Sequence, residues 1–249
     1  MKKSKQFLDQ PICWGTWIST GSPVVAELAS QYPFDWLLID FEHGAVSDAT
    51  LPEILRGISH HPHLSVIIRV PDFQPSLISK ALDWGADGIM LPHVRSAQDA
   101  ARCVAAMRYP PRGKRGYSSS VRAYGYGVAP PTVPSDIQPL LFAQIEDLEG
   151  VNQAQAIAAV DGVDVLFVGP ADLKMALEAS DAEEKPTYGD ALQRVSDAAN
   201  AYGKRSGILV RDQGSLPQLL ACGYTCIAID SDIAILRAGY ERLISARRS

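Results

Sequence analysis

The sequence has few cysteines, no excess of positive charge and no long apolar run, and each shortage excludes a class of protein. Its 249 residues include four cysteines, Cys13, Cys103, Cys222 and Cys226. No second cysteine pair or nearby histidine completes a zinc site, so we expect free thiols in a reducing compartment. No apolar run approaches the roughly 20 residues of a membrane span, and residues 1–15 hold no apolar stretch of signal-peptide length. We therefore expect a cytoplasmic protein with no membrane partner.

The charge balance argues against a nucleic-acid partner. The formal net charge is −5 and the isoelectric point is near 5.5, whereas nucleic-acid-binding proteins usually present a basic face. One basic cluster, at residues 108–115, is short and is interrupted by two prolines and a glycine. It remains a candidate for contact with a small anionic substrate, although a solvated loop face is the simpler interpretation.

Short apolar runs alternate with helix-like segments along the whole chain, which predicts a (β/α)8 TIM barrel formed by residues 1–249 as a single domain. The expected strands are residues 12–18, 36–41, 65–70, 88–92, 140–145, 163–168, 206–210 and 225–229. The expected helices lie near residues 23–32, 48–60, 75–84, 96–107, 150–160, 187–203, 214–222 and 232–247. Segments 109–139 and 174–186 read as irregular loops. A doubly wound sheet is the alternative, but the Gly-rich first turn typical of that fold is missing.

Polar residues follow several of these strands at the point where each ends. Asp40, Glu42 and His43 lie at the end of the second strand, Arg69 lies at the end of the third, and His93 follows the fourth. Gln144 and Glu146 end the fifth strand, and Gly169, Ala171 and Asp172 follow the sixth. Because barrel active sites lie at the carboxyl ends of the strands, these residues are expected to form one site.

Glu146 and Asp172 are the candidate metal ligands. They follow neighbouring strands, so their carboxylates can converge on one ion, and oxygen ligands suit Mg²⁺ or Mn²⁺. Helix-capping acids or solvent-facing charges are the competing interpretation. The turn at 169–172 also offers backbone N–H groups to an anion at a helix start.

His43 is the candidate general base, because histidine ordinarily titrates near neutral pH. Asp40, three residues earlier, is expected to orient its ring. Arg69 interrupts an apolar strand, and a buried guanidinium needs an anionic partner such as Asp40, Glu42, Glu146 or a substrate oxyanion. A purely structural ion pair is the alternative for Arg69. Trp17, near the end of the first strand, is a candidate substrate-binding residue.

Six short motifs in chain order resemble the HpcH/HpaI aldolase/citrate lyase family, the class II pyruvate aldolases. They are Asp-Phe-Glu-His at 40–43, Ile-Arg-Val at 68–70, Leu-Asp-Trp-Gly-Ala at 82–86, Tyr-Pro-Pro-Arg-Gly-Lys-Arg-Gly at 109–116, Gln-Ile-Glu at 144–146 and Val-Gly-Pro-Ala-Asp-Leu at 168–173. Each motif alone is loose, but the ordered set covers roughly residues 8–245.

The resemblance implies an enzyme that cleaves 2-keto-4-hydroxy acids to pyruvate, or hydroxypyruvate, and an aldehyde. It implies a divalent metal (Mg²⁺ or Mn²⁺, with Co²⁺ a third candidate) held by Glu146 and Asp172, and a base formed by His43 with Asp40. It further implies that Arg69 steadies the enolate oxygen and that Gln144 and the amides around Gly169, Ala171 and Asp172 bind the substrate carboxylate. A homo-oligomer, a dimer or a hexamer that exchanges the last helix, is also implied.

Elementary chemistry agrees with a metal-dependent route. A pyruvate C–H is too weak an acid for an unaided histidine, and a divalent cation stabilises the charge of the enolate. A Schiff-base route would need a lysine in the barrel interior, and none of the expected strand cores contains one.

Two other functions compete with this interpretation. A related enolate enzyme acting on oxaloacetate or a citrate-like polycarboxylate is suggested by Arg112, Lys114, Arg115 and Arg122. Residues 174–184 stand where the family usually has a Gly-rich loop of small residues near the mouth of the site, so the resemblance leaves the substrate and the reaction open there. A phosphate-handling or non-catalytic barrel is less favoured. The turns after the last two expected strands contain one glycine and three acidic residues rather than a Gly-rich sequence.

Overall fold

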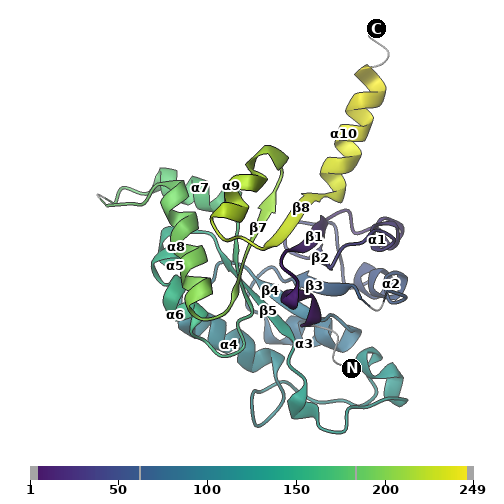
Figure 1. Ribbon diagram of the computed structural model, residues 1–249. Helices are drawn as coiled ribbons and strands as arrows, with labels where there is room; N and C mark the ends of the chain where they lie inside the picture. The colour runs from purple at the N-terminus through teal and green to yellow at the C-terminus, as the bar shows by residue number, and fades with distance from the viewer. Residues whose placement is uncertain (1–4, 62, 183, 246–249) are drawn as a thin grey trace.

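A computed structural model describes residues 5–61, 63–182 and 184–245. Eight parallel strands close into a barrel in which each strand pairs with its neighbours in sequence and β8 pairs with β1. Helices surround the barrel (Figure 1). The predicted (β/α)8 fold is confirmed.

The strands lie within two residues of their expected bounds. They are β1 Cys13–Ile18, β2 Trp36–Asp40, β3 Ser65–Arg69, β4 Gly88–Leu91, β5 Leu140–Ile145, β6 Val165–Val168, β7 Arg205–Val210 and β8 Cys226–Ser231. β2 to β6 are buried at every position, which explains why they read in the sequence as nearly continuous apolar runs.

The helices follow the expected order, except that one expected helix is divided and one further helix, α7, is present. The α-helices are α1 Pro23–Ser30, α2 Thr50–Gly57, α3 Pro75–Trp84, α4 Ala97–Met107, α5 Leu148–Asn152, α6 Ala154–Ala158, α7 Pro170–Ala179, α8 Tyr188–Ala201, α9 Leu216–Ala221 and α10 Asp232–Ser245. The 3₁₀ helices are η1 Gln6–Asp9, η2 Arg122–Gly127, η3 Pro134–Asp136 and η4 Gln213–Ser215. The helix expected at 150–160 is divided at Gln153 into α5 and α6. The last two residues of the helix expected at 232–247 lie outside the described residues.

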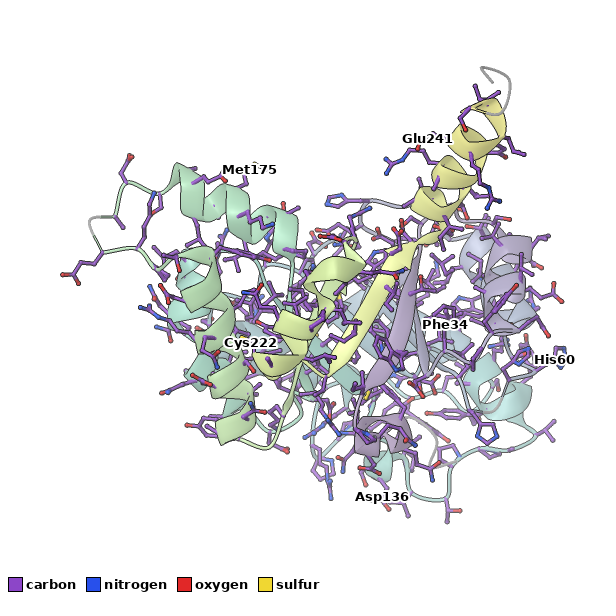
Figure 2. The ribbon with its side chains drawn as sticks, turned by 45° about the horizontal axis from the view of Figure 1, so that its top comes forward. Phe34, His60, Asp136, Met175, Cys222 and Glu241 are labelled. Carbon is purple, nitrogen blue, oxygen red and sulfur yellow. The ribbon has the colours of Figure 1, made fainter. Side chains whose placement is uncertain are left out.

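The expectation that residues 174–186 form an irregular loop is wrong for its first half. Residues 174–179 belong to α7, whose Met175 lies on an ordered turn of helix in Figure 2. Leu173 and Leu177 are buried four residues apart, and the intervening residues are good helix formers. The acidic composition around residue 183, itself outside the described residues, hid this short amphipathic pattern.

Aromatic side chains fill the barrel interior. Trp36, Phe142 and Phe167 are fully buried, with ring centroids 5.4 to 6.1 Å apart. Glycine makes room for them, because a Cβ on Gly15 would lie 2.3 Å from the Trp36 ring. Phe7 of η1 joins the same buried cluster, next to the N-terminal end of β1.

The last helix leaves the barrel. Figure 1 shows α10 projecting away from the other elements, and Glu241 lies on this projecting part in Figure 2. Asp232 fixes its first turn by accepting hydrogen bonds from the backbone of Ser19 and Thr20 at 2.9 and 3.0 Å. Beyond this turn, large apolar side chains are exposed: Ile235, Leu236, Tyr240, Leu243 and Ile244. In the described part of the chain, no helix is long and apolar enough to cross a membrane.

The packing around Trp36 predicts that Gly15→Ala destabilises the fold. The added methyl group overlaps a ring that has no free space to enter, so we expect a loss of about 1–3 kcal/mol in the free energy of unfolding. Gly116→Ala is the matched control, because nothing lies within 4 Å of a Cβ at that position. Urea unfolding followed by circular dichroism measures both. Equal stability of the two variants would contradict the packing described here.

Candidate functional site

The strand-end polar residues gather on one face of the barrel, as predicted. Asp40 and Arg69 are register partners at the ends of β2 and β3. The backbone N–H of His93, after β4, donates to a carboxylate oxygen of Glu146, after β5. Asp172, in the first turn of α7, acts electrostatically on Glu146. One continuous cluster therefore joins the ends of β2 to β6.

Arg69 is the centre of the cluster's first half. Its Nε and Nη2 atoms donate to the two oxygens of Asp40 at 2.9 and 2.8 Å, and its Nη1 atom lies 3.0 Å from Oε2 of Glu42. The guanidinium also lies 5.1 Å over the Trp17 ring, and its side chain is 8% exposed. Asp40 and Glu42, two of the four anionic partners expected for Arg69, therefore contact it in the structure.

Asp40 does not orient the His43 ring as the spacing suggested. Its Oδ1 atom accepts the backbone N–H groups of Glu42 and His43 at 3.1 and 3.2 Å, and both its oxygens are bound by Arg69. The His43 ring extends toward solvent with 70% of its side chain exposed, and its Nε2 atom lies 3.9 Å from Glu42. The three-residue spacing therefore places the backbone N–H of His43, rather than its imidazole, against the Asp40 carboxylate.

Glu146 lies at the centre of the second half. Its side chain is 2% exposed, and its Oε2 atom accepts the backbone N–H of His93 at 3.0 Å. Its Oε1 atom faces Gly169, where an added Cβ would lie only 2.4 Å away. Position 169 must therefore be glycine for this carboxylate to occupy its place between β5 and α7.

Burial raises the pKa of the Glu146 carboxyl above its usual value. The negative charges of Asp172 and Glu42 act in the same direction, while the N–H group and the ring of His93 oppose them. Burial also raises the pKa of Glu42, against the lowering effect of Arg69, His43 and His93. In Asp40, the bonds and charge of Arg69 and two backbone N–H groups outweigh burial, and they lower the pKa.

His93 is a part of the site that the sequence analysis treated only as a strand-end residue, and Glu42 was expected there only as a partner of Arg69. Glu42 has 8% of its side chain exposed and contacts Arg69 directly. His93 has its ring Nδ1 atom 3.2 Å from Glu146 and its Nε2 atom 3.9 Å from Glu42. The signal for both was their position one or two residues after a buried strand.

Gln144 and Trp17 are both buried, but they differ in their hydrogen bonds. Gln144 is buried, and its Oε1 atom has no hydrogen-bond partner among the residues that the structure describes. A 180° rotation of the amide would bring its NH₂ group, a donor, to the same position. Trp17 is 4% exposed and donates its indole N–H to Asp40 at 3.3 Å. The Trp17 ring therefore packs on the inner side of the Arg69–Asp40 ion pair and does not reach the exposed surface of the site.

The described residues contain no group of three or more histidine, cysteine, aspartate or glutamate side chains placed to hold a metal ion. Glu146 and Asp172 form a pair only, so any further ligands would have to be water, substrate or another type of group. Of the cysteines, Cys13, Cys103 and Cys226 are buried, Cys222 is partly buried, and all four are free.

The basic cluster lies away from these residues. Arg115 is paired with Asp83 at 2.6 Å, and Arg122 donates to the backbone oxygens of Trp84 and Leu55. Asp83 and Trp84 end α3 just before β4 begins, which is the amino-terminal end of the barrel. A cavity of about 970 Å³ opens there, lined by Lys5, Arg115 and Tyr124 among others, and by none of the strand-end polar residues.

Comparison with known proteins gives one consistent family. Residues 14–238 match the model of the HpcH/HpaI aldolase/citrate lyase family. A 5-keto-4-deoxy-D-glucarate aldolase of Salmonella arizonae is 36% identical over 239 residues, which cover 94% of this chain and 91% of the relative.

Solved structures agree. An HpcH/HpaI aldolase/citrate lyase family protein from Burkholderia cenocepacia superimposes with a TM-score of 0.90 at 32% identity, covering 99% of this chain and 98% of the other. The citrate synthase SbnG superimposes with a TM-score of 0.81 at 27% identity, covering 98% and 97%.

The raised pKa of Glu146 predicts that Glu146→Gln stabilises the metal-free protein at neutral pH. A carboxyl whose folded pKa lies above its unfolded value of about 4.5 costs stability once it ionises, and this cost grows as pH rises through that interval. Glutamine removes the charge and keeps an oxygen for the His93 N–H. The gain should disappear near pH 4, where the carboxyl is protonated in both states.

Urea unfolding at neutral pH and near pH 4, in the presence of a chelator, measures this difference. Glu149→Gln, at an exposed position on α5, is the control and should change stability little at either pH. If Glu146→Gln is no more stable than the parent at neutral pH, neighbouring groups offset the free-energy cost of burying the Glu146 charge, and the raised pKa is contradicted.

Proposed function

The chain belongs to the HpcH/HpaI aldolase/citrate lyase family, and we propose that it is a metal-dependent aldolase that cleaves 2-keto-4-hydroxy acids through a pyruvate-type enolate. The observation that carries this proposal is the pairing, on one barrel face, of a buried carboxylate beside Asp172 with a buried guanidinium. Glu146 and Asp172 supply concentrated negative charge, and Arg69 supplies a positive group at the end of β3, with β4 between it and the strand that Glu146 follows.

The residues around Glu146 fit a hard divalent cation. Among the described residues, no lysine or arginine forms an ion pair with the buried Glu146 carboxylate, and the negative charge of Asp172 adds to the cost of its own charge. A cation bound by Glu146 and Asp172 would relieve both effects, and their oxygen atoms suit Mg²⁺ or Mn²⁺, with Co²⁺ a further candidate. When bound, such an ion supplies positive charge that stabilises the enolate oxygen of the substrate.

Arg69 provides the second positive charge. Two of its five N–H groups bind Asp40 and a third faces Glu42, which leaves donors on Nη1 and Nη2 for a substrate oxygen. Because Asp40 binds the Nε–Nη2 edge of the guanidinium and Glu42 contacts Nη1, the plane of the group is fixed before substrate arrives. Preorganised donors of this kind stabilise developing negative charge without reorganisation.

The remaining groups complete a site for a keto acid. The backbone N–H groups of Ala171 and Asp172, at the amino end of α7, are donors for the substrate carboxylate, and so is the Gln144 amide once its NH₂ group takes the position of the unpaired Oε1 atom. The exposed imidazole of His43 is the proton acceptor for the carbon next to the keto group, acting through water. In the cleavage direction, the bond between carbons 3 and 4 breaks, the 4-hydroxyl loses its proton, and carbon 3 gains one.

The substrate we propose first is the one named for the relatives. In 5-keto-4-deoxy-D-glucarate a keto group stands next to a carboxylate, and a hydroxyl lies two carbons away. It is therefore a 2-keto-4-hydroxy acid when numbered from the keto end, and its cleavage yields pyruvate and an aldehyde that carries the second carboxylate. The 36% identity of the relative supports this class of substrate.

The alternative, an enolate enzyme acting on oxaloacetate or a citrate-like acid, has support from the similarity to SbnG. It loses the support of the basic loop, since Arg115 is occupied by Asp83, Arg122 by backbone oxygens, and both lie at the opposite barrel end. The aldolase reaction is therefore preferred.

We also infer that the protein self-associates through α10, as a dimer or hexamer. Its exposed apolar residues would be covered by a second copy, and α1 with the turn that follows it offers a matching exposed stripe at Val24, Leu28 and Tyr32. A cytoplasmic location remains a prediction.

The proposed function predicts pyruvate release from 5-keto-4-deoxy-D-glucarate when Mg²⁺ or Mn²⁺ is present. The activity should be lost with a chelator and restored by excess metal. Coupling pyruvate to its reduction by a dehydrogenase provides the measurement, and a panel of other 2-keto-4-hydroxy acids tests the aldehyde side. Faster turnover of oxaloacetate, alone or with acetyl-CoA, than of any panel member would favour the alternative.

The proton-transfer assignment predicts that His43→Ala slows exchange of the pyruvate methyl hydrogens in D₂O. Removal of a general base typically lowers the rate by on the order of 10² to 10⁴. Metal affinity should stay unchanged, because the imidazole is largely exposed and its acidic neighbour is Glu42 rather than Glu146. Proton NMR with saturating Mg²⁺ follows the exchange. His60→Ala, at an exposed turn after α2, is the control. Unchanged exchange in His43→Ala would transfer the role to Glu42.

A further inference from the structure

His93 is the residue of this site that the proposed chemistry leaves unused. It follows β4 directly after Pro92 and stands between the two halves of the cluster. Its backbone has a φ of 51°, in the left-handed region, which is uncommon for a residue other than glycine. Such strain at a site points to a function that the surrounding structure preserves.

The left-handed backbone brings two atoms of His93 to one oxygen of Glu146. The backbone N–H donates to Oε2 at 3.0 Å, and the ring Nδ1 atom lies 3.2 Å from the same oxygen. The other edge of the ring faces Glu42, with Nε2 3.9 Å from Oε1 of that residue. The imidazole therefore stands between two buried carboxylates that otherwise repel each other.

This arrangement fixes the orientation of the Glu146 carboxylate. Oε2 is directed toward His93, so Oε1 is left facing Gly169, at the start of the helix that carries Asp172. Without the ring, the carboxylate would keep one backbone hydrogen bond but lose the group that holds Oε2 away from Glu42.

We propose that His93 is a positioning residue that orients Glu146 for the divalent cation and so sets the affinity of the site for that ion. This inference rests on the proposed function, because it assumes that Glu146 is a metal ligand. Loss of a residue that orients a ligand typically weakens metal binding 10- to 100-fold. His93 acts through Glu146, so at saturating metal the chemical step should proceed at close to the parent rate.

Three variants separate the ring from the backbone. His93→Gly keeps the N–H group and adopts a positive φ without strain, so it removes only the ring. His93→Asn tolerates the left-handed region and places an amide nitrogen at the position of Nδ1, the same number of bonds from the backbone. Tyr126→Gly is the matched control, since Tyr126 also has a positive φ of 59° but lies in η2, outside the site.

Mn²⁺ binding to the metal-depleted protein, measured by electron paramagnetic resonance of the free ion, tests the inference. We expect Mn²⁺ affinity to fall 10- to 100-fold in His93→Gly, to remain close to the parent in His93→Asn, and to be unchanged in Tyr126→Gly. The metal concentration for half-maximal pyruvate release should shift in parallel, while kcat at saturating Mn²⁺ changes little.

Parent-like affinity in His93→Gly, or an equal loss in His93→Gly and His93→Asn, would overturn the role of the ring. A parent protein that binds no Mn²⁺ at all would refute the proposed function itself. The two failures are therefore distinguishable.

Discussion

The buried guanidinium of Arg69 is the group on which the site depends. A positive charge at the end of β3, with 8% of its side chain exposed, is tolerable only when anions surround it, because removing a charge from water costs several kcal/mol. Asp40 meets this need with two hydrogen bonds, and Glu42 contributes a third contact. Asp40 in turn accepts two backbone N–H groups, which fixes the turn that carries His43. One ion pair therefore orders the ends of β2 and β3.

The barrel and the location of the site could be predicted from the sequence for a physical reason. Strands buried on both faces leave continuous apolar runs, and parallel strands place all their carboxyl ends on one face. A polar residue that directly follows one of these strands therefore lies near the polar residues that follow the neighbouring strands. Arg69, Glu146 and Asp172 are related in this way, and knowledge of the element boundaries was enough to associate them.

Side-chain direction could not be predicted in the same way. Asp40 and His43 are three residues apart, yet they meet through a backbone N–H, because the chain turns after β2 and directs the ring outward. Trp17 follows the barrel pattern but points inward, beneath Arg69. The left-handed backbone of His93 leaves no mark in a sequence, since only glycine signals such a conformation reliably. The helix at residues 174–179 was not predicted, because the polar and acidic composition of the segment obscured the four-residue spacing of Leu173 and Leu177.

The contrast between Asp172 and His43 has a consequence for the range of reactions that such a site supports. Asp172 lies in the first turn of a helix whose next residue, Leu173, is buried, so its position is fixed by the hydrophobic core. The His43 ring is 70% exposed, and its nearest charged neighbour is 3.9 Å away. Asp172 is therefore held by packing, whereas the ring of His43, the proton acceptor that we propose, has solvent around it. In the proposed reaction, an imidazole with space to rotate can serve both directions of a reversible step and can reach aldehydes of different length, while the groups proposed to bind the keto acid keep their positions.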